Sequence, residues 1–410
     1  MHQLFAAILA LAILPVLLKW KIPSGYAIIL MGIIAGLVGG FSAAEILRAF
    51  SDVFFSWSSL SSVLAVIQIA LLGALMTRYG LFRRAEEAIK QVLPVPKLII
   101  MLMPSLIGVL QVPGGAALSA PFCNSIGQKM RLSESQRSNT NVICRHQFSL
   151  FLPFSAWVIQ INELVPELDQ QIFLFSCLCF SAINVVSNYF FFLRKAEKLE
   201  LPKLHWCKRL QALGELLVAI SPILTVFAVN SIFGLPVAFC VPFAILVAFL
   251  LSDHDGFGKQ IIQSFNKNLA WTIIGVYFFQ NIIKRMDQLL TLGSSVLLIG
   301  SELVFLLGIA IIAILFGVAT GLIYVSLGVL LPIIVTAFPA DPIGLTIAAF
   351  YVFCWSYIGY MFSPVHMCQL LSDRECGSTV KARYRTYIPM FITLAGASVM
   401  LYGVTSLLFH

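Results

Sequence analysis

Charged side chains are scarce in this sequence. Asp, Glu, Lys and Arg make up 11% of its 410 residues, whereas 60% of the residues are hydrophobic. The polar surface of a soluble protein of this length cannot be built from so few charges, so a soluble globular fold is excluded. The mean hydropathy of +0.95 predicts instead a chain that lies mostly within a lipid bilayer.

Motifs of the common enzyme and pump classes are absent as well. The sequence has no His-Glu-x-x-His, no Gly-x-Ser-x-Gly and no pair of aspartates within an apolar segment, which disfavours an intramembrane enzyme. It has no Walker A motif, so it cannot hydrolyse nucleotides as a P-loop pump does. The nine cysteines show no zinc-site or disulfide spacing, and we interpret them as small apolar side chains.

The net charge of +8 does not indicate nucleic-acid binding. Lys and Arg lie in short segments between apolar runs, which is typical of the cytoplasmic loops of membrane proteins. The first three residues carry no Lys or Arg, so we expect the first apolar run to remain as a membrane helix and not to be cleaved. We therefore predict a multi-pass protein of the cell membrane, with a bacterial or archaeal inner membrane favoured.

Two stretches, from Leu106 to Pro121 and from Leu315 to Pro332, are alike in sequence, so that Gly108 corresponds to Gly317. The Pro-Gly-Gly at residues 113–115 ends a helix within the first apolar segment. A helix break at membrane depth is tolerated only where it is buried in protein or lines a wet cavity. Matching breaks in two halves of a chain indicate the binding site of a secondary transporter.

The apolar runs fall into two series with the same order and spacing. The predicted spans are 4–18, 24–40, 59–77, 98–127 (interrupted), 141–161 and 170–193 in the first series, and 212–232, 234–251, 269–283, 301–337 (interrupted), 342–371 and 386–408 in the second. The matching order favours a duplication, with a first repeat over residues 1–193, a cytoplasmic linker over 194–211 and a second repeat over 212–410.

The number of crossings sets the relation between the repeats. If each interrupted segment is a re-entrant hairpin that returns to its own side, each repeat crosses the membrane five times, and the repeats must be inverted. The basic linker then lies in the cytoplasm and both termini lie outside. We therefore predict an all-α polytopic membrane protein with two inverted repeats, each of five crossings plus a re-entrant hairpin followed by a broken helix.

Binding residues are expected where the hairpin tips meet, because a restarting half-helix offers free N–H groups and the positive end of its dipole to an anion. The candidates of the first hairpin are Pro113, Gly114, Gly115, Ser119 and Asn124, and those of the second are Thr320, Gly321, Tyr324 and Ser326. The alternative is that these small residues serve only close helix packing.

A second break follows each hairpin, within RHQFSLFLPF, which begins at Arg145, and within FSPVH, which contains Ser363 and ends at His366. An arginine inside a membrane costs about 2.5 to 3.5 kcal/mol on insertion scales. Arg145 is therefore either a fixed counter-charge for an anion or a snorkelling residue at the end of its span. His146 and His366 are candidates either for carrying a proton or for structural hydrogen bonds. These four residues complete the set of candidate substrate-binding residues.

The run MPSLIGVLQVPGGAALSAPF, the stretch from Asn141 to Pro153 and the later SPVHMCQLLSD resemble hallmark segments of the domain-of-unknown-function 401 family of integral membrane proteins. The resemblance covers nearly the whole chain and implies a place in the ion transporter superfamily. It also implies an inverted-repeat fold with two hairpins and elevator-type transport of small anions coupled to sodium or protons. The Ser-Asn-Thr signature of sodium/dicarboxylate relatives is absent from both hairpin tips, so neither a dicarboxylate substrate nor a conventional sodium site is implied.

The sequence thus predicts a secondary active transporter of a small anionic solute, with a carboxylate as the favoured class. A passive channel and a membrane subunit of a multi-component transporter are the alternatives. The expected partners are the solute and the lipid bilayer, with a homodimer as one assembly to consider and no nucleic acid. We expect no cofactor and no metal apart from a coupling ion, Na+ or H+.

The inverted arrangement makes a topological prediction. In a variant without native cysteines, a cysteine at Gln170 should react with a membrane-impermeant maleimide added to intact cells, because the acidic loop before it carries no Lys or Arg. A cysteine at Lys203, in the basic linker, should react only after permeabilisation. Equal accessibility of the two positions would contradict the odd number of crossings.

Overall fold

The chain folds into helices throughout the part that the structure describes. This computed structural model covers residues 2–110, 115–199, 205–288, 291, 302–338 and 341–409, and every regular element within them is helical. Among the described residues, five helices are long and apolar enough to cross a membrane: Trp57–Arg78, Gln170–Leu193, Trp206–Phe233, Pro342–Met361 and Val380–Phe409. The all-helical prediction is confirmed for these residues, and the chain is a multi-pass membrane protein by composition and helix length.

The helices of the first half follow one another with short connections. They are α1 (His2–Lys19), α2 (Ser24–Val38), α3 (Ala43–Phe55), α4 (Trp57–Arg78), α5 (Leu81–Val92), α6 (Pro96–Gly108), α7 (Ala116–Lys129), α8 (Glu134–Arg145), the 3-10 turn η1 (Phe148–Leu150), α9 (Ala156–Leu164) and α10 (Gln170–Asn188), which continues as a π-helical turn, η2 (Tyr189–Leu193). The interrupted segment 98–127 therefore corresponds to α6 and α7.

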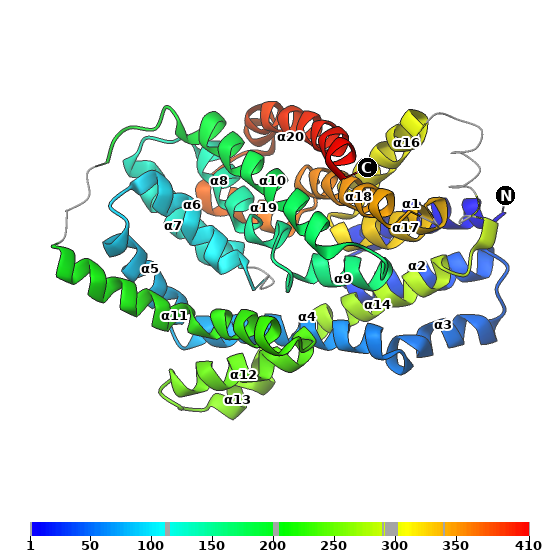
Figure 1. Cartoon of the computed structure of the whole chain (residues 1–410), viewed down its shortest axis with the longest axis horizontal. Coiled ribbons are helices and arrows are strands. Elements are labelled where there is room, and N and C mark those ends of the chain that lie inside the picture. Colours follow the sequence, from blue (N-terminus) through cyan, green and yellow to red (C-terminus); the bar gives the residue numbers. More distant parts are fainter. Residues whose placement is uncertain are drawn as a thin grey trace.

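The second half has the same order of long and broken helices. They are α11 (Trp206–Phe233), α12 (Val237–Leu250), α13 (Phe257–Ser264), α14 (Lys267–Ile283), α16 (Glu302–Thr320), α17 (Ile323–Ala337), α18 (Pro342–Met361), α19 (Met367–Cys376) and α20 (Val380–Phe409). The interrupted segment 301–337 corresponds to α16 and α17, and the predicted span 342–371 is divided between α18 and α19. In Figure 1, α11, α4 and α3 run below the hairpins and the broken helices, and α12 and α13 lie lower still, beneath α11 and α4.

The basic connection after α4 contains a helix, α5, that the search for apolar runs missed. Its buried residues, which include Leu81, Ala85 and Ile89, recur at helical spacing, and the helix packs against α11. Arg84 on its outer side forms an ion pair with Glu215 of α11, at 3.0 Å. A short amphipathic helix carries too many charges to be recognised as a membrane segment, although its apolar residues recur in the sequence with the helical period of 3.6 residues.

The predicted span 141–161 is wrong in its boundaries. The helix α8 begins at Glu134, where Ser133 caps it by accepting a hydrogen bond from the Gln136 amide, and it ends at Arg145. The chain then makes an irregular segment before α9 begins at Ala156, capped by Ser155. The polar sequence of α8 concealed it, because its polar side chains are buried in protein contacts and do not face lipid.

The two halves pack crosswise against each other. Helix α2 of the first half packs against α14 of the second, and α12 of the second packs against α4 of the first. The amphipathic helices also pack against the other half, α3 against α14 and α13 against α4. Two further contacts of this kind are those of α8 with α20 and of α18 with α10. The approach of α2 to α14 is close enough that a Cβ on Gly25 would lie 2.5 Å from Cβ of Trp271. Neither half can therefore bury its helix faces alone.

Each hairpin contacts the broken helix that follows it through a glycine. A Cβ on Gly108, at the end of α6, would lie 1.7 Å from the backbone oxygen of Arg145. A Cβ on Gly317, near the end of α16, would lie 2.5 Å from the backbone nitrogen of Tyr360. The two glycines that correspond in sequence therefore make the same kind of contact, each with the end of the helix α8 or α18.

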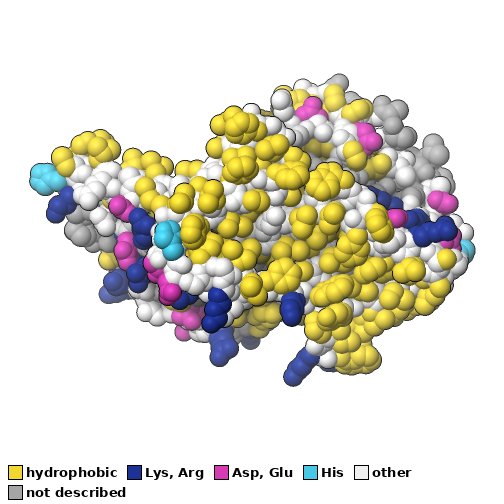
Figure 2. Space-filling view, turned by 90° about the horizontal axis from the view of Figure 1, so that it is seen from below, with side chains coloured by type: hydrophobic (Ala, Val, Ile, Leu, Met, Phe, Trp, Pro, Cys, Tyr) yellow, Lys and Arg dark blue, Asp and Glu magenta, His cyan; other side chains and the backbone are white. Residues whose placement is uncertain are grey.

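Charged side chains are separated from the apolar surface. Figure 2 shows a face with broad hydrophobic areas, on which charged side chains gather at the two ends of the long axis and along part of the lower edge. Several basic connections meet at one end, where Lys97 donates to the backbone oxygen of Arg194 and Arg209 donates to that of Val92. Broad apolar areas with charged ends are what a membrane-spanning body requires.

We predict that Gly108→Ala lowers the thermal stability of the purified protein. The added methyl group overlaps the backbone of Arg145, so α6 and α8 must move apart, and overpacking of this kind costs about 1 to 3 kcal/mol. Gly214→Ala is the matched control, because a Cβ at this helical glycine of α11 meets nothing within 4 Å. Melting temperatures in detergent check both variants, and an unchanged value for Gly108→Ala would refute the close contact.

Candidate functional site

The two helix breaks meet inside the protein. His146 follows the last residue of α8, and His366 precedes the first residue of α19, so the two residues lie at opposite ends of their breaks. Their ring centroids are 5.2 Å apart. Tyr360, near the end of α18, places its ring 4.0 Å from that of His366 and its hydroxyl oxygen 3.4 Å from Nε2 of His146. The structure thus brings together candidate residues from both halves of the chain.

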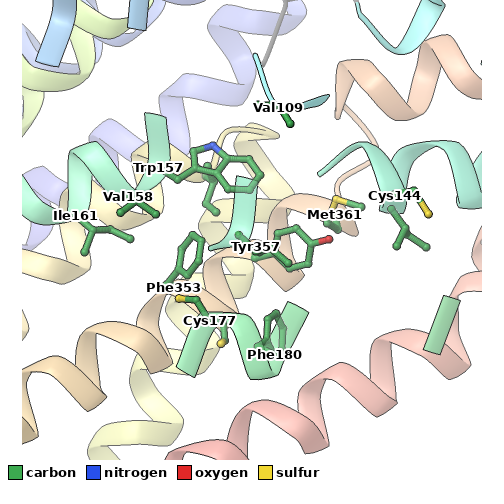
Figure 3. Close-up of a cluster of buried hydrophobic side chains, with 14 of the residues drawn as sticks. Val109, Cys144, Trp157, Val158, Ile161, Cys177, Phe180, Phe353, Tyr357 and Met361 are labelled. Atoms are coloured by element: carbon green, nitrogen blue, oxygen red, sulfur yellow. The ribbon is translucent and has the colours of Figure 1, made fainter. Parts of the chain in front are cut away.

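Aromatic side chains of α9 and α18 support this meeting point. Trp157 stacks on His146, with ring centroids 5.5 Å apart and an interplanar angle of 27°. It also contacts the rings of Tyr360 and Tyr357 at 5.8 and 6.2 Å. Figure 3 shows Trp157 beside Phe353 and Tyr357, in a buried cluster that also includes side chains of α10. These rigid contacts fix the orientation of the His146 ring.

Arg145 is buried in the protein interior. Its side chain is 2% exposed, and a Cβ on Gly115 would lie 2.2 Å from Nη2 of its guanidinium group. The guanidinium therefore lies directly against the residue that precedes α7, on the first hairpin. A side chain in this position does not snorkel to a membrane surface, so that alternative is wrong. The positive charge of Arg145 also acts on both imidazole rings and on Tyr360.

The tip of the second hairpin contacts the second break. Thr320 donates to the backbone oxygen of Phe316 at 2.7 Å and accepts from the amide of Leu322 at 3.1 Å, which closes the turn between α16 and α17. Gly321 has a φ of +62°, and a Cβ there would lie 3.2 Å from the backbone nitrogen of His366. Ser363 donates to the backbone oxygen of Val318 at 2.7 Å. These candidates shape the backbone around His366.

The other candidate residues of the hairpins make further contacts, within the hairpins or with neighbouring helices. Ser326 hydrogen-bonds to Ser356 at 2.7 Å, between α17 and α18, as the packing alternative expects. Ser119 is buried, and its hydroxyl donates to the backbone oxygen of Gly115 at 3.5 Å. Tyr324 lies beside the meeting point, because its hydroxyl is hydrogen-bonded with Trp157, and its backbone oxygen accepts from Gln160 of α9, at 3.0 Å. Pro113 and Gly114 lie outside the described residues.

Asn124 is not at the meeting point. It follows Gly115 by more than two helical turns, which places it about 13 Å further along α7. Its side chain donates to the backbone oxygen of Glu375 at the far end of α19, at 3.1 Å. Asn124 therefore helps to hold α7 against α19, and the helix geometry separates it from the other candidates.

A buried polar network next to this site was missed by the sequence analysis. Asp373 of α19 forms an ion pair with Arg383 of α20 at 2.6 Å, and both side chains are less than one-tenth exposed. Ser138 of α8 donates to the same carboxylate at 2.6 Å, and Gln369 donates to it at 3.3 Å. The only sequence signal is a run of polar residues in α8, because the partners in α19 and α20 lie far along the chain.

A second carboxylate also lies among helices. Glu163 is on α9 and accepts hydrogen bonds from Ser59 and Ser62 of α4, at 2.6 and 2.8 Å. This contact fastens the second part of the first broken helix to α4. The residue is in the last turn of its helix.

A cleft of about 780 Å³ lies on another side of the first hairpin, between α5, α7 and α11. Three lysines, Lys90, Lys129 and Lys208, contribute to its lining, together with Leu118 and Phe122 of α7. None of the residues at the meeting of the breaks lines this cleft. The cleft is basic and partly apolar, and α7 is the helix common to it and to the hairpin.

The central arrangement is called the break cluster here and consists of Arg145, His146, Tyr360 and His366. It combines a permanent positive charge with imidazole and phenol groups, and Arg145, His146 and His366 are buried in the protein. A charge-assisted hydrogen bond is stronger in such surroundings than in water. The break cluster therefore has the chemistry to hold a small anion.

Interrupted helices, a polar cluster at their meeting point and helices that can cross a bilayer define a polytopic membrane protein of all-helical fold. The chain belongs to the family described as "Protein of unknown function (DUF401)", whose model matches residues 3–405. The predicted family is confirmed. A search of curated proteins finds no match.

The fold has a counterpart among solved structures. The chain is similar to the structure described as "Crystal structure of the Alcanivorax borkumensis YdaH transporter reveals an unusual topology". The TM-score is 0.57 and the sequence identity is 14%, with 88% of each chain covered. At this identity the likeness concerns the fold, which extends over most of both chains.

We predict that Asp373→Asn strongly destabilises the protein. Removal of one partner leaves the Arg383 charge buried without its carboxylate, and breaking a buried pair in this way costs about 3 to 5 kcal/mol. Glu215→Gln is the matched control, because the Arg84–Glu215 pair is exposed and an exposed pair contributes about 0 to 1 kcal/mol. Thermal unfolding in detergent should separate the two variants clearly. Equal melting temperatures would contradict a structural role for the buried pair.

Proposed function

We propose that this protein is a secondary active transporter of a small anionic solute, with a carboxylate as the favoured class. The observation that carries the proposal is the position of Arg145. Its guanidinium group is buried at the end of a broken helix, against Gly115 of the first hairpin and beside His146. A guanidinium presents a planar fork of donors that matches a carboxylate through two parallel hydrogen bonds.

The adjacent helix strengthens the proposal. Gly115 immediately precedes α7, so the first amides of this helix and the positive end of its dipole lie near the Arg145 side chain. Both groups favour negative charge, and they come from different segments of the first half. His366 and Tyr360 add groups from the second half. An anion held here would contact both halves of the chain.

The packing supports two repeats of opposite orientation, over residues 1–193 and 212–410, joined by the linker 194–211. Several helix contacts between the halves have a counterpart with the roles exchanged, as α2 with α14 and α12 with α4. The contacts of Gly108 with Arg145 and of Gly317 with Tyr360 are a further matched pair. Exchange of partners is what a pseudo-two-fold axis between inverted repeats produces. This arrangement also favours a place in the ion transporter superfamily.

Transport in this proposal follows an elevator-type mechanism. The hairpins and broken helices form one packed body around the break cluster, and α2, α4, α12 and α14 form contacts between the halves. A movement of the first group against the second would carry the bound anion across the bilayer. Protons or sodium ions are the proposed driving ions, and ionophores that collapse each gradient separately distinguish them. The likeness to the fold of the YdaH transporter agrees with this proposal.

We predict that Arg145→Lys weakens solute binding while the protein still folds and inserts. Lysine keeps the charge but loses the planar fork, and loss of one charge-assisted hydrogen bond of about 1.5 to 3 kcal/mol corresponds to roughly tenfold to a hundredfold weaker binding. A thermal-shift screen of wild-type protein against mono-, di- and tricarboxylates, with and without sodium, identifies the solute. The same assay then compares Arg145→Lys with Arg84→Lys, a matched change at an exposed pair.

Uptake into proteoliposomes completes this test. Concentrative uptake that an ionophore abolishes supports the secondary transporter, whereas uptake that only equilibrates the solute favours a passive channel. If the purified chain binds a solute but proteoliposomes that contain it take up none, the chain is a subunit of a larger transporter. Near-normal uptake by Arg145→Ala would refute the role of Arg145 as counter-charge.

A further inference from the structure

Two histidines and one cysteine converge in the space between the helix breaks. The potential ligand atoms of His146, His366 and Cys368 all lie within 4.8 Å of one another. His146 comes from the first broken helix, whereas His366 and Cys368 flank the start of α19 in the second. The two histidines are buried and Cys368 is half-buried. The convergence of these three residues is a result of the fold, since their separation in the sequence gives no metal-binding spacing.

His366 has unused hydrogen-bonding capacity. Within the described residues, neither Nδ1 nor Nε2 of His366 has a hydrogen-bond partner, although its side chain is only 1% exposed. A buried polar group without a partner costs about 1 to 3 kcal/mol, so an imidazole in this position indicates a ligand. The ring is near His146 and Cys368, and each of these also offers a metal-binding atom.

We infer that His146, His366 and Cys368 form a binding site for a soft or borderline transition-metal ion, with Zn2+ as the best fit. Imidazole nitrogen and thiolate sulfur are the preferred ligands of Zn2+, whereas Mg2+ and Ca2+ require oxygen ligands. Around a tetrahedral zinc ion the ligand atoms are roughly 3.3 to 3.6 Å apart, given Zn–N and Zn–S distances of about 2.0 and 2.3 Å. The ligand atoms, which lie within 4.8 Å of one another, need to approach by at most about 1.5 Å.

The neighbouring groups determine the protonation state in which His146 and Cys368 bind a metal ion. Tyr360 lies 3.4 Å from Nε2 of His146, so its hydroxyl can accept the ring N–H and leave Nδ1 to the metal, as partners of metal-bound histidines do. The charge of Arg145 opposes a cation here. Binding therefore requires the Cys368 thiol to release its proton to solvent as the sulfur–metal bond forms, and the thiolate then offsets this repulsion.

Three protein ligands leave one coordination position of a tetrahedral ion open. Water or an anion occupies such a position in proteins, and the break cluster surrounds this one. The site is thus suited to a metal with an exchangeable fourth ligand. The inference concerns metal binding alone and does not depend on the proposed transport function.

Cobalt(II) is the probe for this site, because cobalt held by a thiolate in tetrahedral geometry has a sulfur-to-metal charge-transfer absorption in the near ultraviolet and strong visible bands. Full-length wild-type protein in detergent should bind one equivalent and show both features, and Zn2+ should abolish them by competition. Cys368→Ser should lose the charge-transfer absorption, and His366→Gln should bind cobalt at least about tenfold more weakly. Cys179→Ser is the matched control, a half-buried cysteine of α10 that lies outside the site.

Folding is monitored separately, by gel filtration and by thermal unfolding without metal. Metal-dependent stabilisation of wild-type protein that is absent from Cys368→Ser supports the site even if the spectral bands are weak. Absence of cobalt or zinc binding by folded wild-type protein overturns the inference, and so does a charge-transfer band that survives in Cys368→Ser. Carboxylate binding by a protein that binds no metal would refute this site and leave the transport proposal intact. Metal binding by a protein that binds no anionic solute would support this site and refute the transport proposal.

Discussion

A helix that ends in the interior of a membrane protein leaves backbone N–H and C=O groups that lipid cannot satisfy. Here the backbone oxygens near the helix ends are bonded by hydroxyl groups of adjoining segments. Ser105 of α6 donates to the oxygen of Cys144 in α8, at 2.8 Å, and Ser363 donates to that of Val318 in α16, at 2.7 Å. These bonds attach each break to a hairpin, so the position of the break cluster depends on them.

The same constraint explains why the broken helices cannot be separated from the hairpins. Gly108 and Gly317 allow the backbone of each hairpin to approach the end of α8 or α18, and this approach lets the serine hydroxyls reach the exposed oxygens. On the other side, Asp373, Arg383 and Ser138 hold α19, α20 and α8 together through buried polar contacts. The result is a rigid frame in which His146 and His366 face each other without needing flexible loops.

Much of this architecture could be predicted from the sequence, but the site only in part. Long apolar runs gave most helices to within a few residues, and Gly321 marked the turn of the second hairpin correctly because its φ is positive. The helix α8 was placed poorly since its polar side chains, such as Asn139 and Asn141, are buried by protein. Hydropathy cannot distinguish polar residues that face water from those that face each other. The convergence of Cys368 with His146 depends on the packing of two distant breaks, which no local pattern records.

The crosswise packing also has a consequence for how the chain is made. While a ribosome is still synthesising the second half, the faces of α2 and α4 that will contact α14 and α12 have no partner. The first half must therefore wait in the membrane with those faces covered by lipid or by an insertion factor. Final assembly begins only when late segments have been inserted, and contacts between residues so far apart in sequence form slowly. Maturation of the protein therefore requires the meeting of its halves.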